Sequence, residues 1–324
     1  MLSYTIAIRT LGTAGEAFRE ELRAIARQTV QPERVLVCIA EGCPRPDFTE
    51  GREEYVWVKR GMVAQRALPY DGVESDCLLL LDDDVRLAPD SAERLLKAME
   101  RYGADAVGAE VFGTHKLGTA AKLHAAVSGL VLPHCSRTWA FRVRRDGSVS
   151  YNNRPVKSFY WSQRCDGPAF LLKRSVLQSL HWEDEQWLDE LGYAYGDDTL
   201  ETYKIFKNGF RLGVLYNSGA VHLDGGTASR AYHKHPRWLY IRTKASFMNW
   251  WRICYTTCGS RFQKALTAAS FALKLAWLLL VVGGLALLSC RPRLLSQYVR
   301  GNADAWKEVR SERMRRLRSY IVVR

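Results

Sequence analysis

Short apolar runs alternate with segments of helical periodicity in the N-terminal part of the chain. Four such runs predict buried strands, at residues 4–8, 35–40, 55–58 and 77–81. Between the first two runs, Phe18, Leu22 and Ile25 recur at helical spacing, and Pro32 ends that pattern. Strand, helix and strand in this order form a βαβ unit. The pattern therefore predicts an α/β fold, with a mostly parallel sheet flanked by helices.

A different apolar pattern occupies residues 265–290, where Lys274 is the single charged residue. Its centre, residues 275–288, would measure about 21 Å as a helix, short of a hydrocarbon core of roughly 30 Å, whereas the whole segment is long enough. Gly283 and Gly284 are expected to break the helix, and basic residues on both flanks disfavour a single span. We favour a re-entrant or in-plane membrane segment. A simple span and a buried helix of a soluble protein are the alternatives.

Charge divides the chain at a similar place. The whole chain has 47 Lys and Arg against 34 Asp and Glu, and its net charge of +13 taken alone is typical of a nucleic-acid-binding protein. Residues 1–229, however, carry −3 and residues 230–324 carry +16. Residues 304–324 have the outline of a basic amphipathic helix, which suits anionic lipid headgroups. We therefore expect the tail to bind membrane lipid and expect no nucleic-acid partner.

Three consecutive carboxylates, Asp82, Asp83 and Asp84, directly follow the fourth apolar run. Their repulsion costs stability unless a cation neutralises it, and oxygen ligands suit Mg²⁺ or Mn²⁺. The alternative is an acidic turn that precedes the helix beginning near Pro89. Arg86 stands where the haloacid-dehalogenase motif needs Thr or Val, and neither a GxGxxG nor a GxxxxGK[ST] loop is present. These acids therefore indicate a metal site, without the features of a phosphatase or a P-loop enzyme.

Further motifs follow in a fixed order along the chain. Thr10 and Glu41 follow the first and second runs, at the edge where ligands bind in parallel sheets. The other segments are GMVAQR (61–66), LLLLDDDV (78–85), CDGPAFLLKR (165–174), LGYAYGDD (191–198) and VHLD (221–224). Taken together, they resemble family 2 of the nucleotide-sugar glycosyltransferases over roughly residues 1–230. Arg9 departs from the family pattern, because it stands where Pro is usual.

The resemblance implies the GT-A fold and an inverting, hexosyl-type transfer from a nucleoside diphosphate sugar. It implies that Mn²⁺ or Mg²⁺ is held by Asp84 and His222 and assists departure of the diphosphate. It also implies that the base that deprotonates the acceptor hydroxyl is Asp197 or Asp198. We favour Asp198, with Asp197 orienting it or raising its pKa. Five residues are expected at the nucleotide sugar, with Glu41 at the base, Arg66 beneath the diphosphate and Asp82 near the ribose: Thr10, Glu41, Arg66, Asp82 and Asp83.

On this interpretation residues 1–230 are the catalytic domain. A basic linker helix region (231–264), the apolar membrane segment (265–290) and the basic amphipathic tail (291–324) follow. We expect the enzyme on the cytoplasmic face of the cell membrane, in polysaccharide biosynthesis for the cell envelope, with a lipid-linked or cell-surface glycan as acceptor. Aromatic residues between Trp139 and Trp161 suit either stacking on that acceptor or core packing. Two other hypotheses stay open: a basic lipid- or nucleic-acid-binding protein whose acids are structural, and a metal-dependent nucleotidyltransferase.

Overall fold

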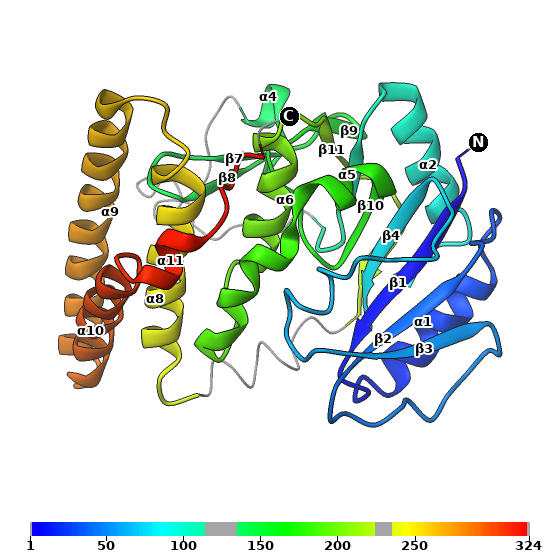
Figure 1. Ribbon diagram of the computed structural model, residues 1–324, viewed down its shortest axis with the longest axis horizontal. Coiled ribbons are helices and arrows are strands. Elements are labelled where there is room, and N and C mark those ends of the chain that lie inside the picture. Colours follow the sequence, from blue (N-terminus) through cyan, green and yellow to red (C-terminus); the bar gives the residue numbers. More distant parts are fainter. Residues whose placement is uncertain (1, 114–134, 224–234, 323–324) are drawn as a thin grey trace.

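The computed structural model describes residues 2–113, 135–223 and 235–322. The strands of the main sheet are β1 (Tyr4–Thr10), β2 (Val35–Ala40), β3 (Glu53–Val58), β4 (Cys77–Asp82), β6 (Ala106–Ala109), β9 (Phe159–Trp161), β10 (Ala169–Lys173) and β11 (Leu212–Leu215). They lie in the order β3-β2-β1-β4-β10-β6-β11-β9 (Figure 1). Two small antiparallel pairs accompany it: β5 (Val85–Leu87) with β12 (Ala220–His222), and β7 (Phe141–Val143) with β8 (Val149–Tyr151).

The four strands expected from the apolar runs are confirmed, and they pair in parallel as β3, β2, β1 and β4. β2 is buried at all six positions, because helices cover both faces of a parallel sheet. β10 and β9 run antiparallel to their neighbours, so the sheet is mixed at its far side. Arg9 of β1 pairs in register with Asp82 of β4, so that the carboxyl ends of these strands meet at one edge.

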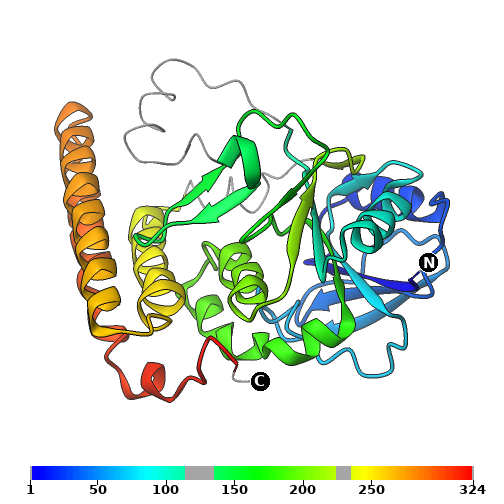
Figure 2. The same ribbon diagram turned by 90° about the horizontal axis from the view of Figure 1, so that it is seen from above.

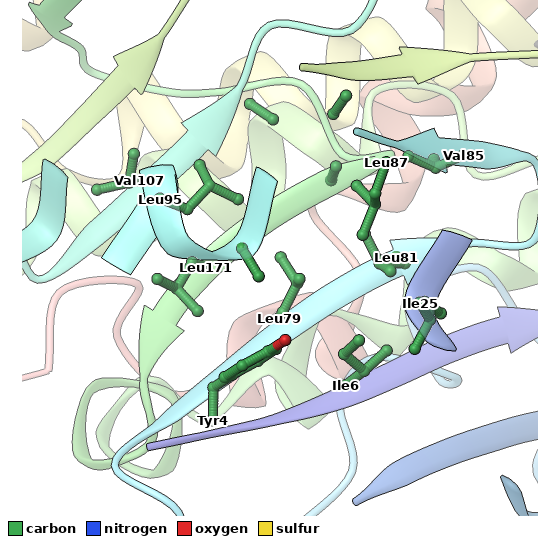
Figure 3. Packing of buried hydrophobic residues seen from close by; sticks show 14 of the residues in the cluster. Tyr4, Ile6, Ile25, Leu79, Leu81, Val85, Leu87, Leu95, Val107 and Leu171 are labelled. Atoms are coloured by element: carbon green, nitrogen blue, oxygen red, sulfur yellow. The ribbon is translucent and has the colours of Figure 1, made fainter. Parts of the chain in front are cut away.

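Helices pack on both faces of the sheet. They are α1 (Glu16–Ala26), α2 (Ser91–Tyr102), the short α4 (Cys135–Thr138), α5 (Arg174–Leu180), the 3₁₀ segment η1 (Trp182–Leu191) and α6 (Asp197–Lys207). Figure 3 shows one layer of this core, in which Leu95 of α2 and Ile25 of α1 face Leu79, Leu81 and Ile6 of the strands. Each such side chain contributes roughly 1.5–3 kcal/mol by leaving water.

The C-terminal part is a layer of helices at the end of the molecule opposite β3 (Figures 1 and 2). It consists of α8 (Trp238–Trp250), the π-helical turn η2 (Trp251–Tyr255), α9 (Arg261–Leu288), α10 (Arg293–Glu308) and α11 (Glu312–Arg316). A Cβ added to Gly301 of α10 would lie 2.9 Å from the main-chain oxygen of Tyr240 on α8. The absence of a side chain at Gly301 therefore lets α10 and α8 pack at backbone distance.

α9 is one unbroken helix of 28 residues that passes straight through Gly283 and Gly284. The expected break at these two glycines is therefore wrong, and with it the re-entrant hairpin. A glycine costs an exposed helix only about 1 kcal/mol, which the surrounding leucine-rich turns outweigh. Only 17% of the most apolar stretch of α9 is buried, so it is not the core helix of a soluble protein either. By length and composition alone, α9 is long enough to cross a membrane.

The basic tail does not form the single amphipathic helix expected over residues 304–324. α10 ends at Glu308, and Ser311 caps a new short helix by accepting a hydrogen bond from the Met314 amide. Val309, Met314 and Tyr320 pack on the body instead of facing lipid, because the body offers them apolar partners, whereas Trp306 is 49% exposed. Tyr320 is 1% exposed, and its hydroxyl donates to the main-chain oxygen of Leu200 on α6 at 2.6 Å.

A hydrophobic cluster joins the C-terminal helices to the sheet-bearing body. We call it the joint core; it includes Leu188, Leu200 and Tyr203 from the body side together with Phe247, Trp250, Phe271, Met314 and Tyr320 from the C-terminal side. Beside it, the Glu185 carboxylate is buried between Lys204 and Arg252, which bind it at 2.9 and 2.7 Å. The C-terminal helices are thus packed into the body.

Candidate functional site

The site lies where β1 and β4 end. The Thr10 hydroxyl donates to Asp83 Oδ2 at 2.5 Å, and the Arg9 guanidinium binds both oxygens of Asp82, at 2.5 and 3.1 Å. Burial, followed by the charges of Asp82 and Asp84, raises the pKa of Asp83 to about 6, although the Thr10 bond lowers it. Of the three carboxylates, Asp82 is therefore neutralised by arginine, whereas the pKa of Asp83 is raised by burial and by its acidic neighbours.

Arg66 is the centre of a second group of contacts and is only 2% exposed. Its guanidinium donates to Asp82 at 2.9 Å, to Glu201 at 3.1 Å and to the main-chain oxygen of Gly167. It also lies 3.6 Å from the carboxylates of both Asp197 and Asp198. Arg66 was expected beneath a diphosphate. The structure shows it as the shared partner of four carboxylates, with Nη1 and Nη2 donating to protein groups, and the contact with a diphosphate stays a prediction.

Asp82, which is expected near the ribose, is likewise bound to protein groups. Both of its oxygens accept from arginines, and these two arginines hold its pKa well below the ordinary range although burial acts in the opposite direction. Oδ2 accepts one of these bonds and Asp82 is 19% exposed, so the contact with a ribose stays a prediction. Asp82 therefore acts first as the link between β4 and the arginines Arg9 and Arg66.

Asp197 and Asp198 begin α6, directly after Gly196. A negative charge is favourable in the first turn of a helix, and Gly196 takes the positive φ of 86° that the chain needs there. Asp197 is 7% exposed and binds Arg9 at 3.1 Å, whereas Asp198 is 31% exposed. Burial and the charge of Asp198 raise the pKa of Asp197 to about 6. Asp198 is therefore the carboxylate of this pair that an incoming group reaches.

Gly167 leaves the space in which the side chains of Arg66 and Asp198 lie. A Cβ at this position would lie 2.0 Å from Asp198 Oδ1 and 2.7 Å from Arg66 Nη1. No side chain fits in that space, so the CDGP segment before β10 needs glycine here. This explains physically why the motif contains that residue.

Asp84 and His222, the predicted metal ligands, lie side by side. The small sheet of β5 and β12 brings them together, with His222 opposite Val85 in the ladder and His222 Nε2 at 3.3 Å from Asp84 Oδ1. Phe112 stacks on the imidazole with a ring-centre distance of 5.2 Å. One carboxylate oxygen and one imidazole nitrogen fit Mn²⁺ or Mg²⁺ as a partial donor set, which water and phosphate oxygens complete.

The described residues contain no group of three metal-ligating side chains. Asp82, the other acid of the motif, is occupied by arginines, which leaves two protein ligands among the residues that the structure describes. Asp224, the last residue of the VHLD segment, lies outside the described residues.

A pocket of about 240 Å³ adjoins the acids, and Thr10, Phe18, Asp47 and Phe48 are among its lining residues. Glu41, expected to bind a nucleotide base, does not line it. Glu41 is exposed at the end of β2, and the carboxylate at the pocket is that of Asp47.

Several site residues escaped sequence reasoning. Arg9 was noted only as a departure from the family pattern, yet it joins Asp82 to Asp197. Glu201 lies one turn after Asp197 on α6, so helical spacing from the Asp-Asp motif was the available signal. The Asp189 carboxylate accepts from the amides of Val63 and Ala64, both at 3.0 Å, and so holds the segment that carries Arg66.

The aromatic residues between the acidic motifs include core residues. Phe159 and Tyr160 are buried, and Phe159 stacks on Tyr102 at a ring-centre distance of 3.9 Å. Of the two interpretations left open, core packing is correct for these two. Trp139, Tyr151 and Trp161 are partly exposed.

The mixed sheet, the strand-end acids and the Asp-Asp helix together define the GT-A fold that the sequence predicts. No family model and no curated protein matches the chain. Among solved structures it is similar to GalNAc-T7, crystallised with UDP, GalNAc and Mn²⁺, with a TM-score of 0.50 and 11% identity. That match covers 83% of this chain and 54% of the GalNAc-T7 chain, so the chain spans about half of that structure.

Two structures of TarS from S. aureus are similar as well. The structure of TarS residues 1–349 gives a TM-score of 0.46 at 13% identity, covering 84% of this chain and 70% of that one. The other TarS structure gives 0.47 at 12% identity, with coverages of 84% and 43%. The likeness to GalNAc-T7 concerns the fold alone, and membership of family 2 stays a prediction.

Glu201 offers a test of the buried charge network through the pH dependence of stability. Burial raises its pKa from the ordinary 4.5 to about 8, although Arg66 lowers it. The folded chain therefore binds this proton more tightly than the unfolded chain, and the free energy of unfolding falls as the pH rises from about 4.5 to 8. Glu201→Gln should remove that loss. Urea unfolding at pH 5, 7 and 9 should show that the free energy of unfolding of the variant rises relative to that of the parent chain as the pH increases.

The exposed Glu33→Gln serves as the matched control and should leave the pH profile unchanged. A Glu201→Gln variant whose stability runs parallel to that of the parent chain across pH 5–9 would contradict the assignment. Asp197, whose pKa is also raised, remains in both proteins; its charge acts on Glu201, so the difference between the two chains reports the pair.

Proposed function

We propose that this protein transfers a sugar from a nucleoside diphosphate sugar to a hydroxyl acceptor, with inversion at the anomeric carbon. One observation carries the proposal. Arg9 and Arg66 tie the strand-end acid Asp82 to the start of α6, and this leaves Asp198 as an accessible carboxylate beside a separate Asp84–His222 pair. A base and a metal-ligand pair at one sheet edge are the two groups that such a transfer needs.

Asp84 and His222 are the residues that would hold the divalent cation. A bound Mn²⁺ or Mg²⁺ would offset the charge that develops on the departing diphosphate. The pocket beside Thr10, with Phe18 and Phe48 among its lining residues, has the size and the aromatic lining that suit a nucleoside. Since GalNAc-T7 was crystallised with UDP, GalNAc and Mn²⁺, a uridine diphosphate sugar with Mn²⁺ is the first donor to test.

Asp198 is the proposed base. Its carboxylate takes the proton of the acceptor hydroxyl as the oxygen attacks the anomeric carbon. Asp197 is buried between Asp198 and Arg9, so it fixes the first turn of α6 and contributes negative charge beside the base. The acceptor we propose is a lipid-linked or cell-surface glycan, because the chain carries the exposed apolar helix α9.

The reaction is tested with the full chain and a panel of nucleotide sugars. Each sugar is added with and without Mn²⁺, and thermal unfolding is followed, because a bound ligand raises the apparent stability. The supporting result is a rise in the unfolding temperature with a nucleotide sugar, followed by release of free nucleoside diphosphate when an acceptor is present. Release of sugar 1-phosphate, with transfer of the nucleotide to the acceptor, would instead show a nucleotidyltransferase.

The ligand pair is tested by Asp84→Ala. A saturating donor, at about 100 times its Kd, stabilises the parent chain by about 2.7 kcal/mol. The variant should lose the Mn²⁺-dependent part of this stabilisation, because one of the two protein ligands is gone. Asp71→Ala, at an exposed position, is the matched control. An Asp84→Ala variant that keeps the full Mn²⁺-dependent shift would refute the metal site.

A further inference from the structure

The outer face of α9 is apolar along most of its length. Leu273, Leu280 and Leu287 follow one another at seven-residue spacing and are 73%, 71% and 81% exposed. Other large apolar side chains of α9 are exposed as well: Phe262, Trp277, Leu279, Leu285 and Leu288. Contiguous exposed apolar surface of this kind marks a site of contact with a membrane or a protein.

The neighbouring helix α10 exposes apolar and basic residues together. Leu295, Val299 and Trp306 are 37%, 50% and 49% exposed. Arg293, Arg300 and Lys307 are exposed beside them, again at seven-residue spacing. In Figures 1 and 2, α10 lies next to α9 on the side of the molecule farthest from β3.

The acids of α10 are engaged by the body. Asp304 accepts from the hydroxyl of Tyr240 at 2.9 Å, and Glu308 lies 3.7 Å from the ammonium group of Lys244. Both acids are only partly exposed, whereas the basic side chains of α10 face solvent. The outer surface of α10 therefore has a positive charge that complements an anionic surface.

The middle of α9 is held by the body. The Lys274 ammonium donates to the main-chain oxygen of Asp146 in the β7–β8 turn at 3.0 Å, and the Phe271 ring stacks on Trp250 at 3.8 Å. α9 measures about 42 Å at 1.5 Å per residue, so these contacts fall near its midpoint. If α9 spanned a bilayer, the β7–β8 turn and α8 would lie in the hydrocarbon core.

We propose that α9 and α10 form a docking surface that lies flat on an anionic lipid bilayer, without crossing it. The apolar face of α9 enters the boundary between headgroups and acyl chains, where amphipathic surfaces insert by roughly 5–10 Å. Arg293, Arg300 and Lys307 take the lipid phosphates. This surface is separate from the acids of the site. Vesicle binding tests the docking surface and sugar transfer tests the site, so the two proposals can fail independently.

The first experiment measures co-sedimentation of the full chain with vesicles of phosphatidylcholine, with and without about one third phosphatidylglycerol. The parent chain should bind the anionic vesicles more tightly. Leu280→Glu places a charge on the apolar face and should weaken binding at least tenfold. Val156→Glu is the matched control, because Val156 is 85% exposed on the body, and it should bind like the parent chain. Equal binding by all three chains would overturn the proposal.

The second experiment removes charge from α10. Each basic residue near an anionic surface contributes about 1 kcal/mol, a factor of about five, so the triple change of Arg293, Arg300 and Lys307 to Gln should weaken binding roughly a hundredfold. The control changes Arg27, Arg154 and Lys157, which are exposed on the body, to Gln. A loss of the same size in the control would show unspecific attraction and would overturn the assignment to α10.

The third experiment separates a flat helix from a span and from a dimer interface. Protein is added to sealed vesicles and labelled with a membrane-impermeant maleimide, either at the exposed Cys290 or, in a Cys290→Ser chain, at Gln263→Cys. Labelling of both ends of α9 from outside supports the proposal. Protection of one end until the vesicles are lysed would show a span. Dimers in light scattering that Leu280→Glu disrupts, together with absent vesicle binding, would assign the surface to a second copy.

Discussion

Replacing Asp198 by Asn should abolish sugar transfer and leave donor binding intact. Asn has almost the same shape but does not accept a proton, so the loss is that of a general base, on the order of 10²–10⁴ in kcat. The 31% exposure of Asp198 and its distance of 3.6 Å from Arg66 mean that the neutral side chain fits without disturbing the buried arginine. Steady-state kinetics with the donor found in the panel give kcat, and thermal shift gives donor binding.

Two further variants test whether the loss of transfer is specific to Asp198. Asp71→Asn, at an exposed position on the body, should transfer at the rate of the parent chain. Asp197→Asn removes a partner of Arg9, so it should lower stability as well as activity. An Asp198→Asn enzyme that keeps transfer within a few fold of the parent chain would remove Asp198 as the base.

Arg66→Ala should be the most destabilising change in the body. It leaves Asp82, Asp197, Asp198 and Glu201 without their shared counter-charge, and breaking a buried ion pair by removing one partner costs about 3–5 kcal/mol. Urea unfolding, or the soluble yield if the chain does not fold, measures the loss. The exposed Arg27→Ala should change the free energy of unfolding by less than about 0.5 kcal/mol.

A second change tests the cause of that loss. Adding Glu201→Gln to Arg66→Ala removes one of the stranded carboxylates and should restore part of the stability. If Arg66→Ala alone unfolds within about 1 kcal/mol of the parent chain, the cluster is not the charge balance described above. If Glu201→Gln lowers the stability of the double variant further, repulsion among the acids is not the cause.

The parallel half of the sheet follows from the sequence because β1, β2 and β4 are buried on both faces, whereas the edge strand β3 is largely exposed. That burial demands continuous apolar runs, and the runs at residues 35–40 and 77–81 show it directly. The pairing of Asp84 with His222 was implied by the resemblance to family 2, and the structure places the two side chains 3.3 Å apart.

Contacts between distant parts of the chain were harder to foresee. Arg66 pairs with Glu201 across 135 positions, and nothing in either local sequence marks the partnership. The tail was read as lipid-facing because its apolar residues alternate with arginines. That pattern fits a membrane and a protein surface equally. In the structure, Tyr320 and Met314 pack in the joint core. The helix does not break at Gly283 and Gly284. The low helix propensity of two glycines costs less free energy than the neighbouring apolar turns contribute.

The joint core affects the order in which the chain folds during its synthesis. The Tyr320 hydroxyl bonds to Leu200, in the same helix as Asp197 and Asp198, and it is synthesised 120 residues later. A nascent chain that has passed Glu201 therefore carries Asp197, Asp198 and Glu201 on a helix that still lacks part of its packing. We expect such a chain to remain inactive until its last turns have folded back, which ties the onset of catalysis to completion of the membrane-docking helices.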